Sequence, residues 1–194
     1  MKISFKNLLI VFLSTILIFL LVNKKENTYK NLDELEITYI DVGQGNAVLV
    51  KTKDKSLLID GGNRSNSRYY YTYIKNKNLK NIDYMIASHY DEDHIAGLIS
   101  ILKNYDVAKV LCPDYKKNTK IYDSFTRSLN NSKAKIIHPK QGDNFNLGKA
   151  KVKILWPKEY ENGKDNDNSI VVKIIYGNMS FLFPADASKN VEDQ

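Results

Sequence analysis

The sequence lacks several features that would identify common classes of protein. It contains a single cysteine, Cys112, so no disulfide bond can form within the chain. No glycine-rich loop is followed by Lys-Ser or Lys-Thr, which leaves a P-loop nucleotide site without support. No G-x-S-x-G segment is present, so a serine-based triad has no nucleophile elbow. Internal repeats are absent as well, which argues against a repeat protein.

An uncharged apolar run covers residues 8–22, and lysines lie on both sides of it. The run is long for the core of a signal peptide and short of the roughly 20 residues of a spanning helix. No A-x-A-like cleavage site follows it. We therefore expect an uncleaved signal anchor over residues 1–23, with a cleaved signal peptide and a buried core helix as alternatives. If the anchor is kept, the remainder of the chain is expected to be a linker over residues 24–35 and a membrane-anchored, extracytoplasmic domain over residues 36–194.

The net charge of +7 could indicate a nucleic-acid partner. The lysines are scattered, however, and Lys149, Lys151 and Lys153 alternate with Val152 and Ile154. This pattern is typical of a strand with one face in water and one face in the core. A solvated surface is the simpler explanation, so the charge allows DNA as a partner without indicating it.

Apolar segments separated by turn residues predict the secondary structure. Helices are expected over residues 68–78, 95–104 and 121–131, and strands over residues 36–41, 46–52, 56–60, 82–88, 107–112, 134–139, 151–157, 169–177 and 179–185. A Gly177-Asn178 turn suits a hairpin between the last two strands, and residues 158–168 are expected to form a loop. Strands at both ends and helices in the middle indicate a mixed α/β (α+β) layered domain.

Five ionisable side chains occupy six positions directly behind the strand expected at residues 82–88. These are His89, Asp91, Glu92, Asp93 and His94. A turn needs only Gly, Asn or a single Asp, and groups crowded in this way repel or desolvate one another unless something binds them. Histidine and carboxylate are ligands for zinc and for harder divalent ions, and two adjacent ions would explain so many ligands. The alternative is that Asp91 and Asp93 cap the following helix and that the histidines are ordinary loop residues.

Two further apolar strands also end on a carboxylate. Asp60 leads onto a glycine-rich turn, and Asp186 follows the last predicted strand. Taken alone, each has a simpler explanation as a turn or cap residue. Asn168 and Ser169 stand just ahead of a buried strand and are expected to support the site, whereas His138 is expected to be a loop residue. Three strand ends that each deliver a carboxylate predict a site at one edge of a sheet.

Four segments together resemble the metallo-β-lactamase fold, and more narrowly the hydrolase domain of ComEC-like DNA-uptake proteins. The segments are "YIDVGQGNAVLV", "LLIDGGN", "IDYMIASHYDEDHIAGL" and "NDNSIVVKIIYGNMSFLFPADAS". The resemblance runs from about Glu36 to Ser188 and its motifs come in the family's order. It implies a four-layer αββα sandwich with a metal site at one edge, between the two sheets. It also implies one or two divalent ions, zinc or manganese, and metal-dependent hydrolysis of phosphodiester bonds, with DNA as the substrate class.

The usual family motif is H-x-H-x-D-H, and Asp91 stands at its second histidine, a substitution typical of the ComEC-like branch. The resemblance implies that His89 and Asp91 belong to one metal position and that Asp93 and His94 belong to the other. Asp186 would bridge the two positions, and Asp60 would support the site. Catalysis is expected to depend on Asp93.

The sequence departs from the family pattern in two places. Asn46 stands where the family commonly has the aspartate of "GQGD". Family members also continue to an "HHGS"-like segment that supplies another metal-binding histidine, whereas this sequence ends at Gln194. We therefore expect a C-terminally incomplete domain whose exposed side is covered by a partner or a missing segment. The alternative function is a catalytically impaired remnant that binds metal or polyanions; a lactam or thioester hydrolase is less favoured because of Asp91.

Overall fold

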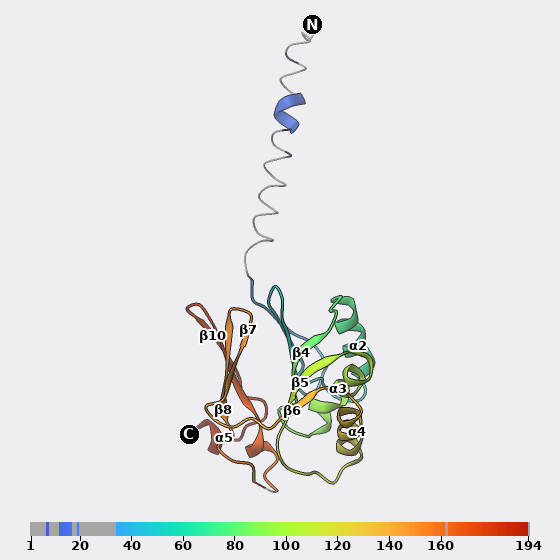
Figure 1. The fold of residues 1–194 in the computed structure, drawn as a ribbon, viewed down its shortest axis with the longest axis vertical. Coiled ribbons are helices and arrows are strands. Elements are labelled where there is room, and N and C mark those ends of the chain that lie inside the picture. The colour runs from blue at the N-terminus through green and yellow to red at the C-terminus, as the bar shows by residue number, and fades with distance from the viewer. Residues whose placement is uncertain (1–6, 8–11, 17–18, 20–33, 162, 194) are drawn as a thin grey trace. The chain divides into compact units, whose positions relative to one another are not determined.

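The computed structural model describes residues 7, 12–16, 19, 34–161 and 163–193. Residues from Glu34 onward form one compact unit, drawn in colour in the lower part of Figure 1. Most of the apolar run at residues 8–22, and with it the predicted anchor, lies outside the described residues. Among the residues that are described, no helix is both long and apolar enough to cross a membrane.

The first sheet has six strands in the order β1-β2-β3-β4-β5-β6. These are β1 (Glu36–Tyr39), β2 (Val48–Lys51), β3 (Ser56–Ile59), β4 (Ile82–Ile86), β5 (Val107–Leu111) and β6 (Lys135–Ile137). The first three strands pair antiparallel, and β3 to β6 pair parallel. Helices α2 (Ser67–Asn76), α3 (Glu92–Asn104) and α4 (Lys120–Asn130) connect the parallel strands. The carboxyl ends of β3 and β4 consequently lie at the same edge of the sheet.

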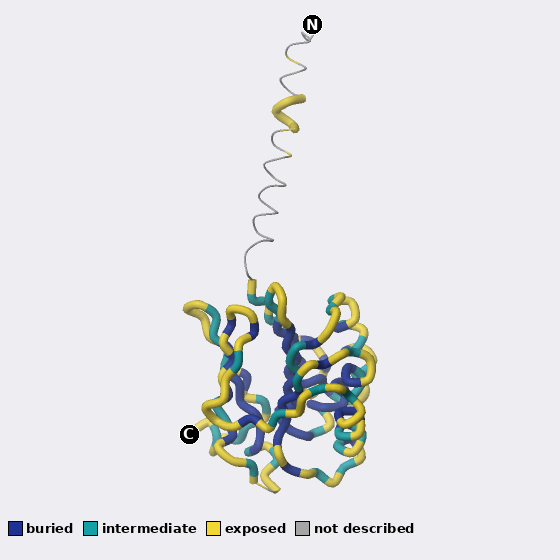
Figure 2. Tube along the Cα trace, viewed as in Figure 1, coloured by how far each residue is buried: buried dark blue, intermediate teal, exposed yellow. Residues whose placement is uncertain are grey.

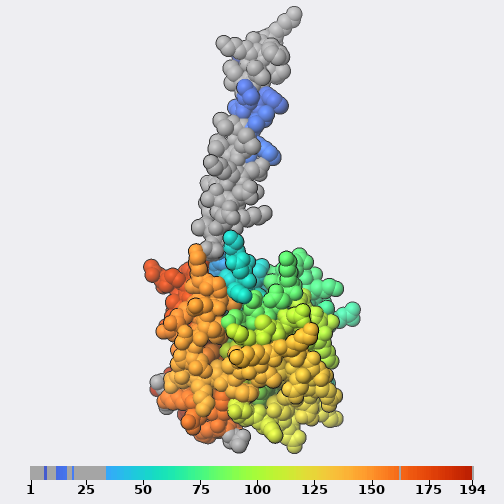
Figure 3. All heavy atoms as spheres, in the orientation of Figure 1, coloured from blue at the N-terminus to red at the C-terminus, as the bar shows by residue number. Residues whose placement is uncertain are grey.

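The second sheet is antiparallel throughout, in the order β10-β9-β8-β7. Its strands are β7 (Asn144–Leu147), β8 (Ala150–Trp156), β9 (Val171–Tyr176) and β10 (Met179–Phe183). The predicted hairpin is confirmed, since Met179 pairs with Tyr176 across the turn. Strand β7 was not predicted, because its short sequence "NFNL" has only two apolar residues. Figure 3 shows the segment between β6 and β7 crossing the front face from one sheet to the other.

Two hydrophobic cores hold the layers together. One lies between the helices and the first sheet and includes Leu58 and Tyr70. The other lies between the two sheets and includes Leu57 and Ile59. Strand β3 is buried on both faces for this reason, and successive side chains point into different cores. Figure 2 shows the buried residues running along the strands of the first sheet and the inner sides of the helices.

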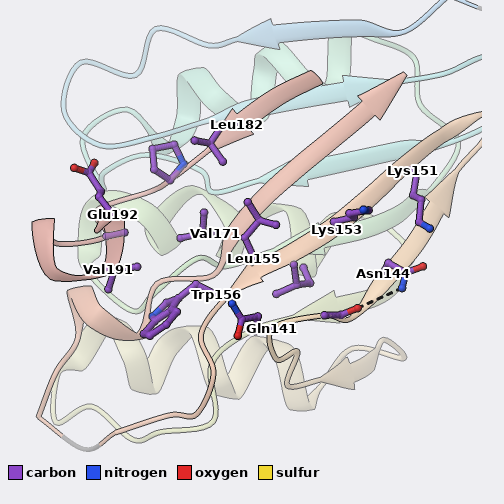
Figure 4. Close-up of a pocket in the computed structure, with 14 residues that line it drawn as sticks. Gln141, Asn144, Lys151, Lys153, Leu155, Trp156, Val171, Leu182, Val191 and Glu192 are labelled. Carbon is purple, nitrogen blue, oxygen red and sulfur yellow. Dashed lines mark hydrogen bonds between the residues drawn. The ribbon is translucent and has the colours of Figure 1, made fainter. Parts of the chain in front are cut away.

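The predicted α/β sandwich with two sheets is confirmed. Among the described residues a helical layer covers the first sheet, and the short helix α5 (Lys189–Glu192) lies beside the second. The outer face of the second sheet carries a groove of about 790 Å³, lined in part by Leu155, Trp156, Leu182 and Val191 (Figure 4). The side chain of Leu182 is 56% exposed. This face therefore combines exposed apolar side chains with strand β10 at the edge of the sheet.

The groove residues should govern the solubility of the folded unit. A contiguous exposed apolar surface on an edge strand favours association between copies. We expect a fragment of residues 34–194 to self-associate, and Leu182→Gln to reduce the associated fraction while the unfolding temperature stays unchanged. Light scattering after size-exclusion chromatography measures the associated fraction. Leu182→Ile is the control that keeps the surface apolar, and an equal associated fraction for the Gln and Ile variants would contradict the prediction.

Candidate metal centre

Three of the predicted ligands converge at the edge of the sandwich. Ligand atoms of His89, His94 and Asp186 all lie within 4.8 Å of one another. His89 follows β4, His94 lies in the first turn of α3, and Asp186 follows β10. The group therefore forms where the carboxyl end of β4, in the first sheet, meets the carboxyl end of β10, in the second. The side chain of Asp186 is 44% exposed, whereas both histidines are buried, so the group is open to solvent on the Asp186 side.

The Nε2 atoms of both histidines are buried and make no hydrogen bond to any described residue. His94 Nε2 lies 3.3 Å from Asp186 Oδ1, and His89 Nε2 lies 3.8 Å from Asp91 Oδ2. A buried polar atom without a partner costs about 1–3 kcal/mol. A divalent ion would satisfy both nitrogen atoms at once, and imidazole with carboxylate is a donor set that zinc and manganese accept. The residues present therefore fit a metal ion.

A buried carboxylate sets the orientation of both imidazole rings. Asp60 is fully buried, and its Oδ2 lies 2.9 Å from His94 Nδ1 and 2.7 Å from Ser88 Oγ. Ser88 Oγ in turn lies 3.1 Å from His89 Nδ1. Every proton finds an acceptor if both Nδ1 atoms carry hydrogen and Ser88 donates to Asp60. This arrangement leaves both Nε2 atoms facing the candidate site, because hydrogen bonds at Nδ1 fix the tautomer and orientation of each ring, as they do for metal-binding histidines.

Close backbone packing places His94 beside Asp60. The amide of Gly61 donates to the carbonyl of His94 at 2.7 Å. A Cβ atom at Gly97 would lie only 2.0 Å from the carbonyl oxygen of Gly61, so no side chain fits at residue 97. Tyr70 of α2 donates to the carbonyl of Asp60 at 3.1 Å. Helix α3 is thus held against the turn that carries Asp60.

Asp91 occupies the N-cap position of α3, yet its side chain makes no capping hydrogen bond. Its Oδ1 instead accepts a hydrogen bond from Lys117 Nζ. The simpler alternative, in which Asp91 only caps the helix, is therefore not what the structure shows. The helix begins at Glu92, three residues before the predicted start, because Ile95 N already donates to the Asp91 carbonyl.

Asp93 lies outside the converging group of three. Its Oδ2 accepts a hydrogen bond of 3.4 Å from Gln44 Nε2, in the turn between β1 and β2. Gly45 of the same turn packs so tightly on Asp93 that a Cβ atom would lie 1.8 Å from its carbonyl oxygen. The glycines of "GQGN" therefore allow this turn to cover Asp93.

The remaining predicted residues have different surroundings. The buried side-chain amide of Asn168 exchanges hydrogen bonds of 2.8 and 2.5 Å with the backbone of Glu161, so it closes the loop between β8 and β9. Ser169 Oγ is buried and has no hydrogen-bond partner among the described residues. His138 Nδ1 lies 2.9 Å from the carbonyl oxygen of Cys112, and His138 is not part of the converging group.

The two histidines have different acidities. Burial alone would lower the pKa of His94, but the hydrogen bond to Asp60 and the charges of Asp60 and Asp186 outweigh it and raise the pKa to about 9. Burial lowers the pKa of His89, and the neighbouring His94 lowers it further. At neutral pH the pair therefore holds an additional proton on His94, which an incoming ion must displace.

Two packed sheets, a helical layer and a cluster of histidine and aspartate at the sheet edge define an α/β sandwich with a candidate metal centre. The chain belongs to the metallo-beta-lactamase superfamily, whose family model matches residues 40–193. Members of this fold are usually metallo-hydrolases, and the predicted resemblance is confirmed.

The relatives with curated descriptions include competence proteins. ComE operon protein 3 of Bacillus subtilis is 23% identical over 179 residues, which are 83% of this chain and 23% of that protein. Competence protein ComA of Neisseria gonorrhoeae is 25% identical over 162 residues, which are 83% of this chain and 21% of that protein. The chain thus spans less than a quarter of the length of these relatives.

Solved structures give the fold independently. The metallo-beta-lactamase fold protein YhfI from Bacillus subtilis matches with a TM-score of 0.56 at 18% sequence identity. The match covers 79% of this chain and 63% of that one. At this level of identity the likeness shows the fold alone.

His89 is expected to be required for binding of a divalent ion, because its unpartnered Nε2 faces the site. Loss of an outer-shell partner alone typically weakens metal binding about 10–100-fold, so His89→Ala should cost at least about tenfold in affinity. Equilibrium dialysis against Zn²⁺ or Mn²⁺ with elemental analysis measures this. His138→Ala, at the third histidine of the chain, is the control and should bind as the wild type does. Equal losses in both variants would refute a site at His89.

Metal affinity should also depend on pH. His94 has a pKa of about 9 and is protonated below that pH, so each bound ion releases a proton. Affinity should rise about tenfold per pH unit between pH 7 and 9 and then level off, since 1.36 kcal/mol accompanies each unit. Calorimetry in buffers of different ionisation enthalpy measures the released proton. A dissociation constant that stays constant from pH 7 to 9 would contradict the assignment.

Proposed function

We propose that this protein is a metal-dependent hydrolase that cleaves phosphodiester bonds, with DNA as its substrate class. The observation that carries the proposal is the convergence of the buried Nε2 atoms of His89 and His94, neither of which is hydrogen-bonded to a described residue, with the carboxylate of Asp186. Membership of the metallo-beta-lactamase superfamily supports hydrolysis as the reaction. The similarity to competence proteins supports DNA as the substrate.

In this proposal His89, His94 and Asp186 hold the ion, and Asp91, whose Oδ2 lies 3.8 Å from His89 Nε2, is a further candidate ligand. A bound divalent ion supplies Lewis acidity and lowers the pKa of coordinated water, which is the chemistry that phosphodiester hydrolysis needs. Because carboxylates contribute to the donor set, manganese should compete with zinc better than in sites built from histidine alone. One ion fits the three converging groups, and Asp93, which accepts a hydrogen bond from Gln44, lies outside them.

The protein side chains have separate tasks in this reaction. Asp60 and Ser88 hold the imidazole rings so that their Nδ1 atoms stay protonated and their Nε2 atoms stay available. Asp93 is proposed as the proton acceptor, because it is adjacent to His94 and lies outside the group that would bind the ion. Asp186 lies on the open side, from which a substrate would reach the site.

The proposal extends to the location of the protein. The apolar run at residues 8–22 would anchor the chain in a membrane, with the domain from residue 36 outside the cytoplasm. An alternative function is a domain that binds metal or polyanions without turnover. The hydrogen bond of 3.4 Å from Gln44 to Asp93 Oδ2 favours this alternative, because it occupies one oxygen of the proposed proton acceptor.

Activity of the full chain on bis(p-nitrophenyl) phosphate and on linear DNA, with and without Mn²⁺ or Zn²⁺, tests the proposal. Asp93→Asn should lower kcat about 10²–10⁴-fold and leave metal affinity unchanged, since it removes a proton acceptor. Asp186→Asn should weaken metal binding itself. Asp54→Asn, in the exposed turn at the opposite end of β3, is the control and should behave as the wild type. Metal binding without any metal-dependent cleavage would establish the alternative function.

A further inference from the structure

A lysine from a distant loop contacts the metal-binding motif. Lys117 lies in the segment between β5 and α4, and its side chain is only 20% exposed. Its Nζ donates to Asp91 Oδ1 and, at 2.7 Å, contacts Asp165 Oδ2. Asp165 belongs to the loop between β8 and β9. One ammonium group therefore joins three segments that are far apart in the sequence. Neighbouring Lys116, by contrast, is exposed.

The contact with Lys117 determines which oxygen of Asp91 is available. Oδ1 is occupied by the ammonium group, and Oδ2 lies 3.8 Å from the unpartnered Nε2 of His89. An isolated, partly exposed aspartate could rotate among several side-chain conformations. A carboxylate held through one oxygen loses that freedom and presents its other oxygen in a fixed direction, as hydrogen-bonded carboxylate ligands do.

The charge of Lys117 by itself would oppose a divalent ion at the same site, because two positive charges close together repel. Asp165 reduces this repulsion. The ammonium group and the Asp165 carboxylate form a contact ion pair of zero net charge. The negative charge of Asp165 therefore offsets part of the repulsion between Lys117 and an ion, and Asp91, Lys117 and Asp165 together carry one net negative charge. Lys117 can therefore orient Asp91 without placing a net positive charge beside the ion.

We propose that Lys117, neutralised by Asp165, is a positioning residue that turns Asp91 Oδ2 toward His89 and makes Asp91 a ligand of the bound metal ion. The inference rests on the proposed metal centre and extends it, because it names the groups that orient Asp91, a ligand which the family resemblance implies. It also ties the loop between β8 and β9 to the site, since this loop supplies Asp165 and is closed internally by Asn168.

Binding of Mn²⁺ and Zn²⁺ by the full chain, measured by calorimetry, tests the inference. Lys117→Met should weaken metal binding about 10–100-fold, the usual cost of losing an outer-shell partner. Lys116→Met is the matched control and should leave the affinity unchanged. Lys117→Arg should restore most of the affinity, because a guanidinium group can contact two carboxylates. Asp165→Asn should weaken binding as well, since it leaves the charge of Lys117 uncompensated.

A double-mutant comparison separates orientation of Asp91 from a general structural effect. In an Asp91→Ala background, Lys117→Met should cause no additional loss of affinity. The absorption spectrum of bound Co²⁺ should change in the same way for Asp91→Ala and Lys117→Met, because both remove the same ligand. Thermal unfolding shows whether each variant is folded. If Lys117→Met does not fold, the metal affinities of Lys117→Arg and Asp165→Asn test the positioning role instead.

The two proposals fail in different ways. If the wild-type chain binds neither ion, the metal centre itself is refuted. If the wild type binds and Lys117→Met binds equally or more tightly, the metal centre stands and the positioning role is overturned. Tighter binding would mean that Lys117 competes with the ion for Asp91. A loss that persists in the Asp91→Ala background would overturn the role as well, because Lys117 would then act through something other than Asp91.

Discussion

The buried carboxylate of Asp60 is the interaction on which the site depends. It accepts hydrogen bonds from the backbone and hydroxyl of Ser88 and from His94, and so it links the ends of β3 and β4 to the start of α3. A buried charge costs several kcal/mol unless such partners satisfy it. Loss of either partner would therefore disturb the imidazole orientation and the packing of three elements together. Binding chemistry and fold stability are coupled at this point.

The layered architecture explains why this carboxylate can be buried. Helices cover one face of the first sheet and the second sheet covers the other, so β3 carries Asp60 into a region with apolar residues on both sides. The parallel order of β3 and β4 then brings Ser88 to it. Close contact between Gly61 and Gly97 brings α3 near enough for His94 to reach the same carboxylate. The burial of Asp60, the approach of Ser88 and the approach of α3 all follow from backbone packing. Together they fix the orientation of the imidazole rings.

Much of the fold could be predicted from the sequence, because long apolar strands and amphipathic helices have strong periodicity. Strand β7 could not, since four residues with two apolar positions do not differ from a polar loop. Within the site, the histidine and aspartate motif was visible as an improbable cluster of charges. Ser88 and Lys117 were not visible: a serine at a strand end resembles any small residue, and Lys117 resembles the exposed Lys116 beside it.

The sequence by itself determined a mixed α/β layered domain and the residue types available for a metal centre, because these follow from local pattern and composition. The family and its two-sheet sandwich came from the resemblance of four motifs. Tertiary structure alone decided which carboxylates face the histidines. It brought Asp186 to His94, turned Asp93 toward Gln44, and paired Asp91 with Lys117. It also paired the side chain of Asn168 with the backbone of Glu161, which closes the loop between β8 and β9. The physical reason is that the direction of a short polar side chain depends on contacts between segments distant in sequence, and local periodicity carries no information about such contacts.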